Sequence, residues 1–433
     1  MALPPVLRNR NFNLFWAGVV LSQIGTRGTV AANLYQVYDL TGSVTQTGLV
    51  GAAQAVALLV LSPLGGVYAD RLDRRRLLQV AQSVSMLVAL LLAGLTLAGD
   101  AEAWHVVASV LFTTAAATFD QPARQALIPA MVPREQLPQA IALLNPSREL
   151  AVLVGPALAG VLIAVGGPGL VYALDAATYA VLVVVLAMVH VERLTGGGER
   201  RSVIASIVEG ASYVRRRPLI YTLMGLDLSA TVFSAYRVLL PALALDILDV
   251  GPTGYGLLSS APSAGALLAT YTIFRVVGRS RRLGRVLLVS LALYGASAIL
   301  LAQSWLFLQA LLAALLLGAF DAMATTIRHA AVQIETPDEV RGRVSAFYQM
   351  SSRGGPAIGD VVVGAVAGVL GPITALTLGG VVPALVALGF LARPNLVRDY
   401  AGATQDEEPG LGDDESGPTA AVADPASPRP MAD

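Results

Sequence analysis

Cysteine and lysine are absent from this chain of 433 residues, and charged residues are scarce, at 13%. Without cysteine there can be no disulfide and no thiolate metal site, and without lysine there is no lysine-based chemistry. An average soluble domain is about 25% charged. Because 55% of the residues are apolar, the composition predicts a polytopic membrane protein.

The usual signals for enzymes and nucleotide-driven machines are missing as well. The three histidines, His105, His190 and His329, lie far apart and suggest no metal-binding pair. We find no phosphate-cradling loop and no serine in a nucleophile-elbow setting, so ATP is not expected to drive the protein directly. We expect no enzyme activity, metal, cofactor or nucleic-acid partner. Aromatic residues make up only 6% of the chain, which argues against a large aromatic cage for drugs.

Apolar segments long enough to cross a bilayer, which takes roughly 20 residues per helix, recur along the chain. We expect an all-α membrane protein with twelve spans, at 11–38, 44–69, 76–98, 103–127, 137–165, 168–190, 219–246, 252–277, 285–303, 305–329, 344–369 and 372–393. The first segment is interpreted as a membrane helix and not as a signal peptide, because no convincing cleavage site follows it.

Arginines in the predicted loops fall mostly on one side of the membrane. They are Arg8, Arg10, Arg71, Arg74, Arg75, Arg76, Arg134, Arg193, Arg200, Arg201, Arg215, Arg216, Arg217, Arg279, Arg281, Arg282, Arg285, Arg341 and Arg343. The opposite loops, such as YDLTGSVTQ, LAGDAEAW and DILDVGPTG, contain none. By the positive-inside rule both termini are cytoplasmic, and we expect a multi-pass protein of the bacterial inner membrane.

Two parts of the chain about 200 residues apart resemble each other. The segments beginning at Phe119 and Phe320 both start with Phe-Asp, and each has an arginine further on, Arg124 and Arg328, before a Pro-x-Glu sequence. Such a repeat predicts two six-helix halves related by an axis along the membrane normal, with the substrate site between them near the midplane. We expect the halves at 1–190 and 219–394.

The remaining segments are the connection between the halves and the C-terminal tail. The connection, 191–218, contains a stretch that is predicted to form an amphipathic helix on the inner membrane surface, although a solvated linker is the alternative. The tail, 395–433, is rich in Pro, Gly, Ala and acidic residues, and we expect it to be a disordered, acidic cytoplasmic segment.

The loop between the second and third predicted spans, GGVYADRLDRRR, is the most informative stretch. Glycines such as Gly66 let helices approach closely, and arginines such as Arg71 and Arg74 favour the cytoplasmic side. Asp70 can accept hydrogen bonds from a helix N-terminus or an arginine. We expect these four residues to form a gating element, with Asp70 and Arg74 holding the halves together on the inner side.

Several segments resemble the major facilitator superfamily: RNRNFNLFW, VYDLTGS, GGVYADRLDRRRLL, PARQALIPAMVPREQLPQAIAL, GPALAG and TPDEVRGRVSAFY. Within it they are similar to the enterobactin-exporter and macrolide-efflux-like group of bacterial exporters. One residue departs from the commonest loop motif, because Asp73 stands where that motif has a second glycine. The resemblance covers all but the tail and implies two pseudo-symmetric six-helix halves that transport a small molecule.

Ionisable residues inside spans cost on the order of 3 kcal/mol on insertion scales and are therefore candidates for function. Glu149, Asp227 and Asp321 are candidate proton carriers, because burial favours a neutral carboxyl and a nearby arginine favours the ionised one. For Glu149 the alternative is a static ion pair with Arg27 or Arg353.

Polar residues also cover much of the first predicted span. Gln23 and Arg27 share one face, and a second polar stripe runs beside it: Ser22, Thr26, Thr29, Asn33 and Gln36. Relatives often carry an acid just after the position of Gly25, and its absence here suggests an anionic or carbonyl-bearing substrate. We interpret the helix as the wall of a wet cavity, although Arg27 could instead neutralise an acid in a neighbouring helix. Candidate substrate contacts are Gln23, Arg27, Asn33, Arg237 and Arg353.

Two further sets of residues are predicted to have structural roles, one in an inner gate and one in helix packing. Asp120, Arg124 and Arg328 are candidates for ion pairs of an inner gate. Asp321 is the approximate repeat mate of Asp120, so inner-gate pairing is favoured for it as well, with proton carriage as the alternative for both acids. Gly155, Pro156 and Gly160 resemble a signature of exporters in the superfamily. They predict a kinked face of small residues that packs against a neighbouring helix, and a generic packing kink is the alternative.

These observations favour a secondary active transporter that works by alternating access. We expect proton-coupled export of a drug-like or siderophore-like molecule by a monomer surrounded by lipid. Uptake of a nutrient, lipid flipping and a sensor that no longer transports are the alternatives.

Overall fold

The computed structural model describes residues 5–71, 73–189, 203–280 and 282–402, and within these ranges it leaves out the side chains of 61–71, 203–207, Asn145 and Arg353. All regular secondary structure in this part of the chain is helical, so the all-α expectation is confirmed. Nine helical segments of the described part are long and apolar enough to cross a membrane. The other three helices of comparable length are α1, α2 and α4.

The first six helices have bounds close to the expected spans. They are α1 (Arg10–Thr41), α2 (Val44–Arg71), α3 (Arg74–Ala98), α4 (Ala103–Met131), α5 (Leu137–Gly166) and α6 (Pro168–Met188). Asp73, which replaces a glycine of the loop motif, is the N-cap of α3, and its carboxylate accepts hydrogen bonds from the backbone N–H groups of Arg75 and Arg76. An aspartate at this position therefore stabilises the start of the helix.

The second group of helices follows the linker helix α7 (Val203–Arg215). It contains α8 (Pro218–Phe233), α9 (Leu240–Ala242), α10 (Gly251–Arg279), α11 (Leu283–Ala302), α12 (Phe307–Ile334), α13 (Asp338–Leu370) and α14 (Pro372–Ala392).

The predicted span 219–246 is not one regular helix. After α8 ends at Phe233, the chain forms a 3-10 turn at Tyr236–Leu239, the short α9 and a π-helical turn at Leu243–Ile247. Pro241 has no N–H group to donate to the carbonyl of Arg237, which disfavours a regular α-helix around that residue. The break gives Arg237 a position outside regular α-helix.

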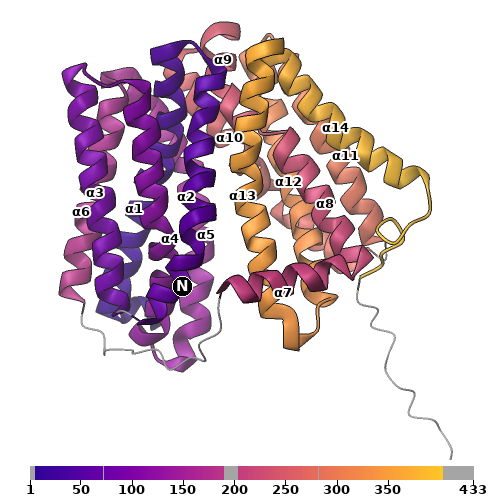
Figure 1. Cartoon of the computed structure of the whole chain (residues 1–433), viewed down its shortest axis with the longest axis horizontal. Helices are drawn as coiled ribbons and strands as arrows, with labels where there is room; N and C mark the ends of the chain where they lie inside the picture. Colours follow the sequence, from indigo (N-terminus) through magenta and orange to yellow (C-terminus); the bar gives the residue numbers. More distant parts are fainter. Residues whose placement is uncertain (1–4, 72, 190–202, 281, 403–433) are drawn as a thin grey trace, which may run out of the picture.

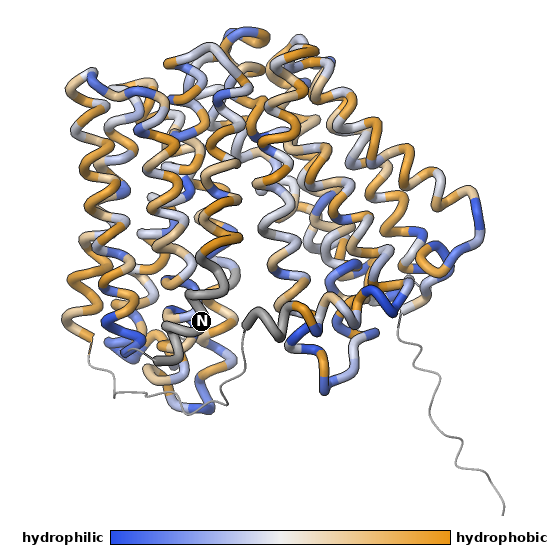
Figure 2. The backbone as a smooth tube through the Cα atoms, in the orientation of Figure 1, coloured by the Kyte–Doolittle hydropathy of each residue, from blue (hydrophilic) through white to orange (hydrophobic). Residues whose placement is uncertain are grey.

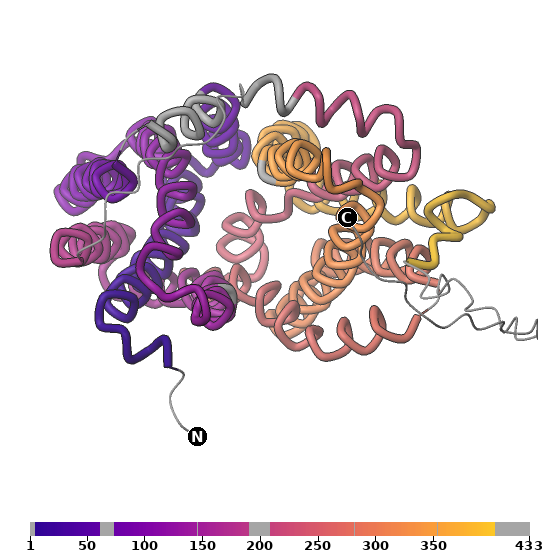
Figure 3. Tube along the Cα trace, turned by 90° about the horizontal axis from the view of Figure 1, so that it is seen from below, coloured from indigo at the N-terminus to yellow at the C-terminus, as the bar shows by residue number. Residues whose placement is uncertain are grey.

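Figures 1 and 3 show α1–α6 side by side in one group and α8–α14 in another. Figure 2 shows that the middle parts of the helices are mostly apolar and that hydrophilic stretches gather at the lower end. We call the end that holds the start of α1 the basic end, because its connections carry the loop arginines. The opposite end is called the acidic end, because its connections carry Asp100, Glu102 and Asp249 and no arginine.

Helix α7 lies across the basic end of the second group (Figures 1 and 3). Glu209 forms a 2.9 Å ion pair with Arg343 of α13, and Gly210 lies directly against the backbone of the same residue. Val214 is buried in the protein core and does not face lipid as an amphipathic surface helix would require. The side chains at 203–207 lie outside the described part.

The C-terminal tail begins later than expected. Residues 395–400 form turns that Asn395 caps with its side chain, and Val397 and Tyr400 are buried. The backbone N–H of Gly284 donates to the carbonyl of Tyr400 at 2.9 Å. The expected disordered segment was therefore placed too early, because these two side chains pack onto α11. Residues 403–433 lie outside the described part.

Candidate functional site

The two helical groups meet at the acidic end. Tyr38 of α1 donates a hydrogen bond to Asp246 of the π-helical turn, and the hydroxyl of Tyr255 on α10 donates to the carbonyl of Ala31 on α1 at 2.8 Å. The rings of Tyr35 and Tyr255 lie 5.6 Å apart between centroids. Polar and aromatic contacts thus join the groups near this end.

Glycines line two seams between the groups. In the α5–α10 seam, a Cβ added to Gly160 would lie 2.6 Å from the carbonyl oxygen of Pro252 and 2.8 Å from the Cα of Gly256. In the α2–α13 seam, a Cβ at Gly48 would lie 2.8 Å from the carbonyl oxygen of Asp360. Helix backbones approach this closely only where side chains are missing.

Towards the basic end, the same helix faces are exposed. Residues about three turns apart share one face of an α-helix. Three turns from the seam contacts lie Glu149 on α5, Leu59 on α2, Leu267 on α10 and Gln349 on α13, and all four are exposed. The groups are therefore in contact at the acidic end and separate from one another towards the basic end.

The second group holds a buried ion pair near its middle. Arg328 of α12 lies 2.5 Å from Asp227 of α8, with side-chain exposures of only 3% and 4%. Arg328 also donates to the hydroxyls of Thr325 at 2.9 Å and Tyr348 at 3.5 Å. Asp321 is exposed and within electrostatic range of both members of the pair. Arg328 therefore forms an ion pair with Asp227 and affects Asp321 only through longer-range electrostatics.

A second ion pair lies at the α2–α13 seam. Arg237 binds Asp360 of α13 at 3.2 Å, and the arginine side chain is 37% exposed while the carboxylate is buried. Asp360 packs against Gly51 of α2. Its other carboxylate oxygen has no hydrogen-bond partner among the described residues. Arg237 is thus a partly exposed cation at the contact between the groups.

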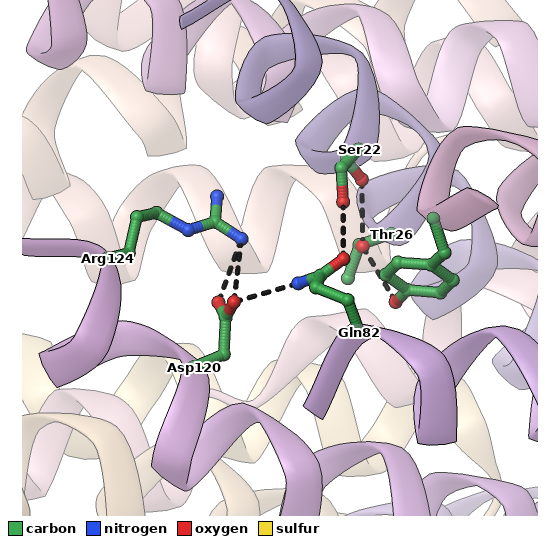
Figure 4. A network of polar contacts seen from close by, with 6 residues as sticks. Ser22, Thr26, Gln82, Asp120 and Arg124 are labelled. Atoms are coloured by element: carbon green, nitrogen blue, oxygen red, sulfur yellow. Dashed lines mark hydrogen bonds and ion pairs between the residues drawn. The ribbon is translucent and has the colours of Figure 1, made fainter. Parts of the chain in front are cut away.

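A polar network connects four helices of the first group (Figure 4). Arg124 binds Asp120 of its own helix at 2.8 Å, and Gln82 of α3 donates to the same carboxylate at 2.8 Å. Ser22 of α1 donates to Gln82 at 3.4 Å, and Thr26 donates to the carbonyl of Ser22 at 2.9 Å. These contacts stay within α1–α6, so in this conformation Asp120 and Arg124 do not form a gate between the groups.

The polar stripe on α1 faces the interior of the first group and not the space between the groups. Its residues contact α3 and α6: the Gln36 side chain bonds Thr96 and Tyr172, and Thr26 lies 2.9 Å from the hydroxyl of Tyr179. Asn33 is buried. The expectation that this stripe, and Asn33 with it, lines a cavity is therefore wrong, because neighbouring helices cover that face.

The other candidates on α1 and α5 lie partly within the first group and partly at its contact with the second. Gln23 and Arg27 are half-buried, and a Cβ at Gly155 would lie 2.6 Å from the Cβ of Arg27. Gly155 thus packs within the first group, whereas Pro156 and Gly160 face α10 in the second.

The loop motif is described only in part. The side chains of Asp70, Arg71 and Arg353 lie outside the described part, as do the surroundings of Gly66, so the proposed latch stays a prediction. Arg74 is half-buried at the start of α3. The neighbouring Arg75 has a defined role, because it donates to the carbonyls of Leu186 and Ala187 at the end of α6.

Sequence reasoning missed several residues of these contacts. Tyr38, Asp246 and Gln82 were not singled out, and no role was given to Asp175, which is buried on α6. A signal existed for Asp175 and Asp246, since both are acids within predicted spans, 168–190 and 219–246. No group of three His, Asp or Glu side chains in the described part could hold a metal ion.

Comparison with known proteins gives consistent matches. The transmembrane secretion effector family matches residues 2–407. The enterobactin exporter of Salmonella typhi is 26% identical over 357 residues, which cover 82% of this chain and 85% of the relative. The enterobactin exporter of Citrobacter koseri is 28% identical over 364 residues, which cover 82% and 84%.

Solved structures share the fold at low sequence identity. A bacterial homologue of the iron transporter ferroportin, in an inward-facing state, has a TM-score of 0.67 at 16% identity, with coverage of 89% of this chain and 99% of that one. A nucleoside transporter has a TM-score of 0.70 at 14% identity, with coverage of 88% and 98%.

Proposed function

Because the chain belongs to the transmembrane secretion effector family, within the major facilitator superfamily, we propose that it is a proton-coupled exporter working by alternating access. The predictions of a superfamily transporter and of a protein that is not an enzyme are confirmed by the family match and the relatives. The division into halves at 1–190 and 219–394, the monomeric state and the coupling to protons belong to the proposal.

The observation that carries the proposal is the one-sided contact between the two groups. Glycine seams and the Tyr38–Asp246 hydrogen bond join the groups at the acidic end, while the same faces are exposed towards the basic end. The positive-inside rule places the basic end in the cytoplasm. This conformation would accept a cytoplasmic substrate between the halves, and rocking of the halves would release it on the other side.

Charged residues at the exposed faces supply candidate contacts for substrate and proton. Asp321 is exposed and lies within electrostatic range of the buried Arg328–Asp227 ion pair. Glu149 is exposed on the α5 face that meets α10. Both are available for proton exchange from the basic end. Arg237 is a partly exposed cation at the contact between the groups and would bind an anionic or carbonyl-bearing substrate. The relatives named as enterobactin exporters support a siderophore-like substrate.

Replacing Asp321 by asparagine is expected to reduce export to background, because the residue could no longer change its charge with each transport cycle. The assay measures enterobactin secretion from a bacterial host that lacks its own exporters, with and without a protonophore. Glu149→Gln is tested alongside, and Glu135→Gln, at an exposed acid outside the spans, is the matched control that should secrete normally.

Three results would count against parts of this function. Secretion that is insensitive to the protonophore would exclude proton coupling. Normal secretion by both Asp321→Asn and Glu149→Gln would exclude these two carboxyls as the carriers and leave Asp227 as the remaining candidate. Accumulation of enterobactin in cells that express the wild-type protein would reverse the direction and favour uptake.

A further inference from the structure

Asp175 is a carboxyl group that the proposed cycle does not use. It lies on α6 with only 1% of its surface exposed. The hydroxyl of Thr178 donates to the backbone carbonyl of Asp175 at 2.8 Å and to its carboxyl oxygen at 3.4 Å. The side chains of Thr26, Thr29 and Tyr179 also lie within interaction range of the carboxyl. The site is therefore built from two helices, α1 and α6.

Gly25 makes room for this site on α1. A Cβ at Gly25 would lie 2.6 Å from the carboxyl oxygen of Asp175 and 2.6 Å from the hydroxyl oxygen of Thr178. Both helices therefore approach closely, and any side chain at Gly25 would push the carboxyl out of its pocket. The burial of Asp175 is thus a property of the packing between α1 and α6.

No cation neutralises Asp175 within the part of the chain that the structure describes. None of the ion pairs between described residues includes Asp175. Helix α6 packs against α1, α3 and α5. The charged and titratable side chains on those helices are Arg10, Arg27, Tyr35, Tyr38, Asp39, Arg74, Arg75, Arg76, Arg148 and Glu149. None of these forms one of those ion pairs with Asp175, and the titratable side chain within its electrostatic range, Tyr179, lies on α6 itself.

A buried hydroxyl group without a hydrogen-bond partner indicates that the site lacks a hydrogen-bond donor. A buried carboxylate without a counter-ion costs several kcal/mol, and such a group usually avoids that cost by holding a proton. A protonated carboxyl has one O–H group to donate. The hydroxyl oxygen of Thr29 is buried and has no hydrogen-bond partner among the described residues, and it lies beside Asp175. It can accept that hydrogen bond.

We propose that Asp175 is a proton-binding residue, which holds a proton between α1 and α6 in this conformation. This bound proton does not depend on the proposed function, because both helices lie in the same half. The hydroxyl of Tyr179 lies 2.9 Å from that of Thr26. From Thr26 the hydrogen bonds continue through Ser22 and Gln82 to Asp120, as Figure 4 shows. A change of charge at Asp175 would therefore act on a network that spans four helices.

Infrared spectroscopy of the full-length protein in lipid bilayers tests the bound proton directly. At neutral pH the wild type should have a C=O stretching band from a protonated carboxyl that is lost in Asp175→Asn. Thr29→Val should keep the band and shift its frequency, because the acceptor is removed. Asp249→Asn, at an exposed acid of the acidic end, is the control that leaves the band unchanged.

Thermal unfolding provides a second measurement that does not depend on transport. Asparagine resembles the protonated carboxyl in shape, so Asp175→Asn should match the wild type below about pH 4 and exceed its unfolding temperature at neutral pH, where the unfolded wild-type carboxyl is ionised. A wild-type spectrum in which Asp175 contributes only carboxylate bands would overturn the proposal. Failure of enterobactin export would reject the proposed function and leave this result in place.

Discussion

Replacing Arg328 by glutamine is expected to destabilise the protein by about 3 kcal/mol or more, because a buried ion pair loses its cation. The arginine lies 2.5 Å from Asp227 with both side chains almost fully buried, and Asp321 is within electrostatic range of it. Its removal leaves the buried carboxyl of Asp227 without a positive partner and takes away the electrostatic stabilisation of Asp321. The free energy of unfolding, measured by titration with SDS, and the thermal midpoint in detergent both report the loss.

Variants of Asp227 and Asp321 are controls for this prediction, because each should lower the free energy of unfolding by a different amount. Asp227→Asn should cost less than Arg328→Gln, since Asp321 remains available to Arg328, and Asp321→Asn should cost least. The double variant Arg328→Gln/Asp227→Asn should recover part of the stability, because neither buried charge is left unpaired. If Arg328→Gln were as stable as the wild type, the account of a shared buried cation would be wrong.

Replacing Gly160 by leucine is expected to open the acidic end. The new side chain would meet the backbone of Pro252 and Gly256, where a Cβ alone already approaches to 2.6 Å and 2.8 Å. Overpacking costs about 1–3 kcal/mol, and a free-energy difference of that size changes the ratio of two conformations by roughly 5- to 150-fold. Gly256→Leu should act in the same way from the other side of the seam.

The absence of native cysteine makes this shift simple to measure. Ser260→Cys introduces a single thiol at a buried position one turn from Gly256. Its reaction with a membrane-impermeant maleimide should be slow in the protein that carries Ser260→Cys alone. It should be roughly 5- to 150-fold faster when Gly160→Leu is added. Gly94→Leu is the matched control, because a Cβ at Gly94 meets no atom within 4 Å. Equal labelling of all three proteins would show that the seam does not control access.

Helix positions and the α5 seam could be predicted from the sequence, but the partners of polar groups could not. Hydropathy places the spans, and Gly-Pro spacing predicts a packing face on α5. The repeat suggested equivalent roles for Asp120 and Asp321. In the structure Asp120 pairs with Arg124 one turn away on α4, whereas Asp321 is about two turns from Arg328, too far for such a pair. Arg328 therefore binds Asp227 on another helix.

The pattern of polar residues along a helix also does not predict which neighbouring helices pack against each of its faces. Both faces of α1 carry polar residues, and only the packed structure shows that Thr26 and Asn33 face the interior of the first group. The break after α8 has only a partial signal in Pro241, because Pro156 and Pro262 lie inside continuous α-helices. Proline alone therefore predicts neither the break nor where Arg237 will point. The pairing of Asp175 with hydroxyl groups depends on Gly25, a residue that the sequence could not connect with it.

Distance measurements between paired spin labels test alternating access most directly. Glu135→Cys with Glu339→Cys reports on the basic end, and Gln46→Cys with Thr253→Cys reports on the acidic end, since all four residues are exposed. The account predicts that a change of pH in lipid bilayers lengthens one distance while it shortens the other, and that Gly160→Leu does the same at constant pH. If the two distances stayed fixed, or changed independently of one another, alternating access about these seams would be contradicted.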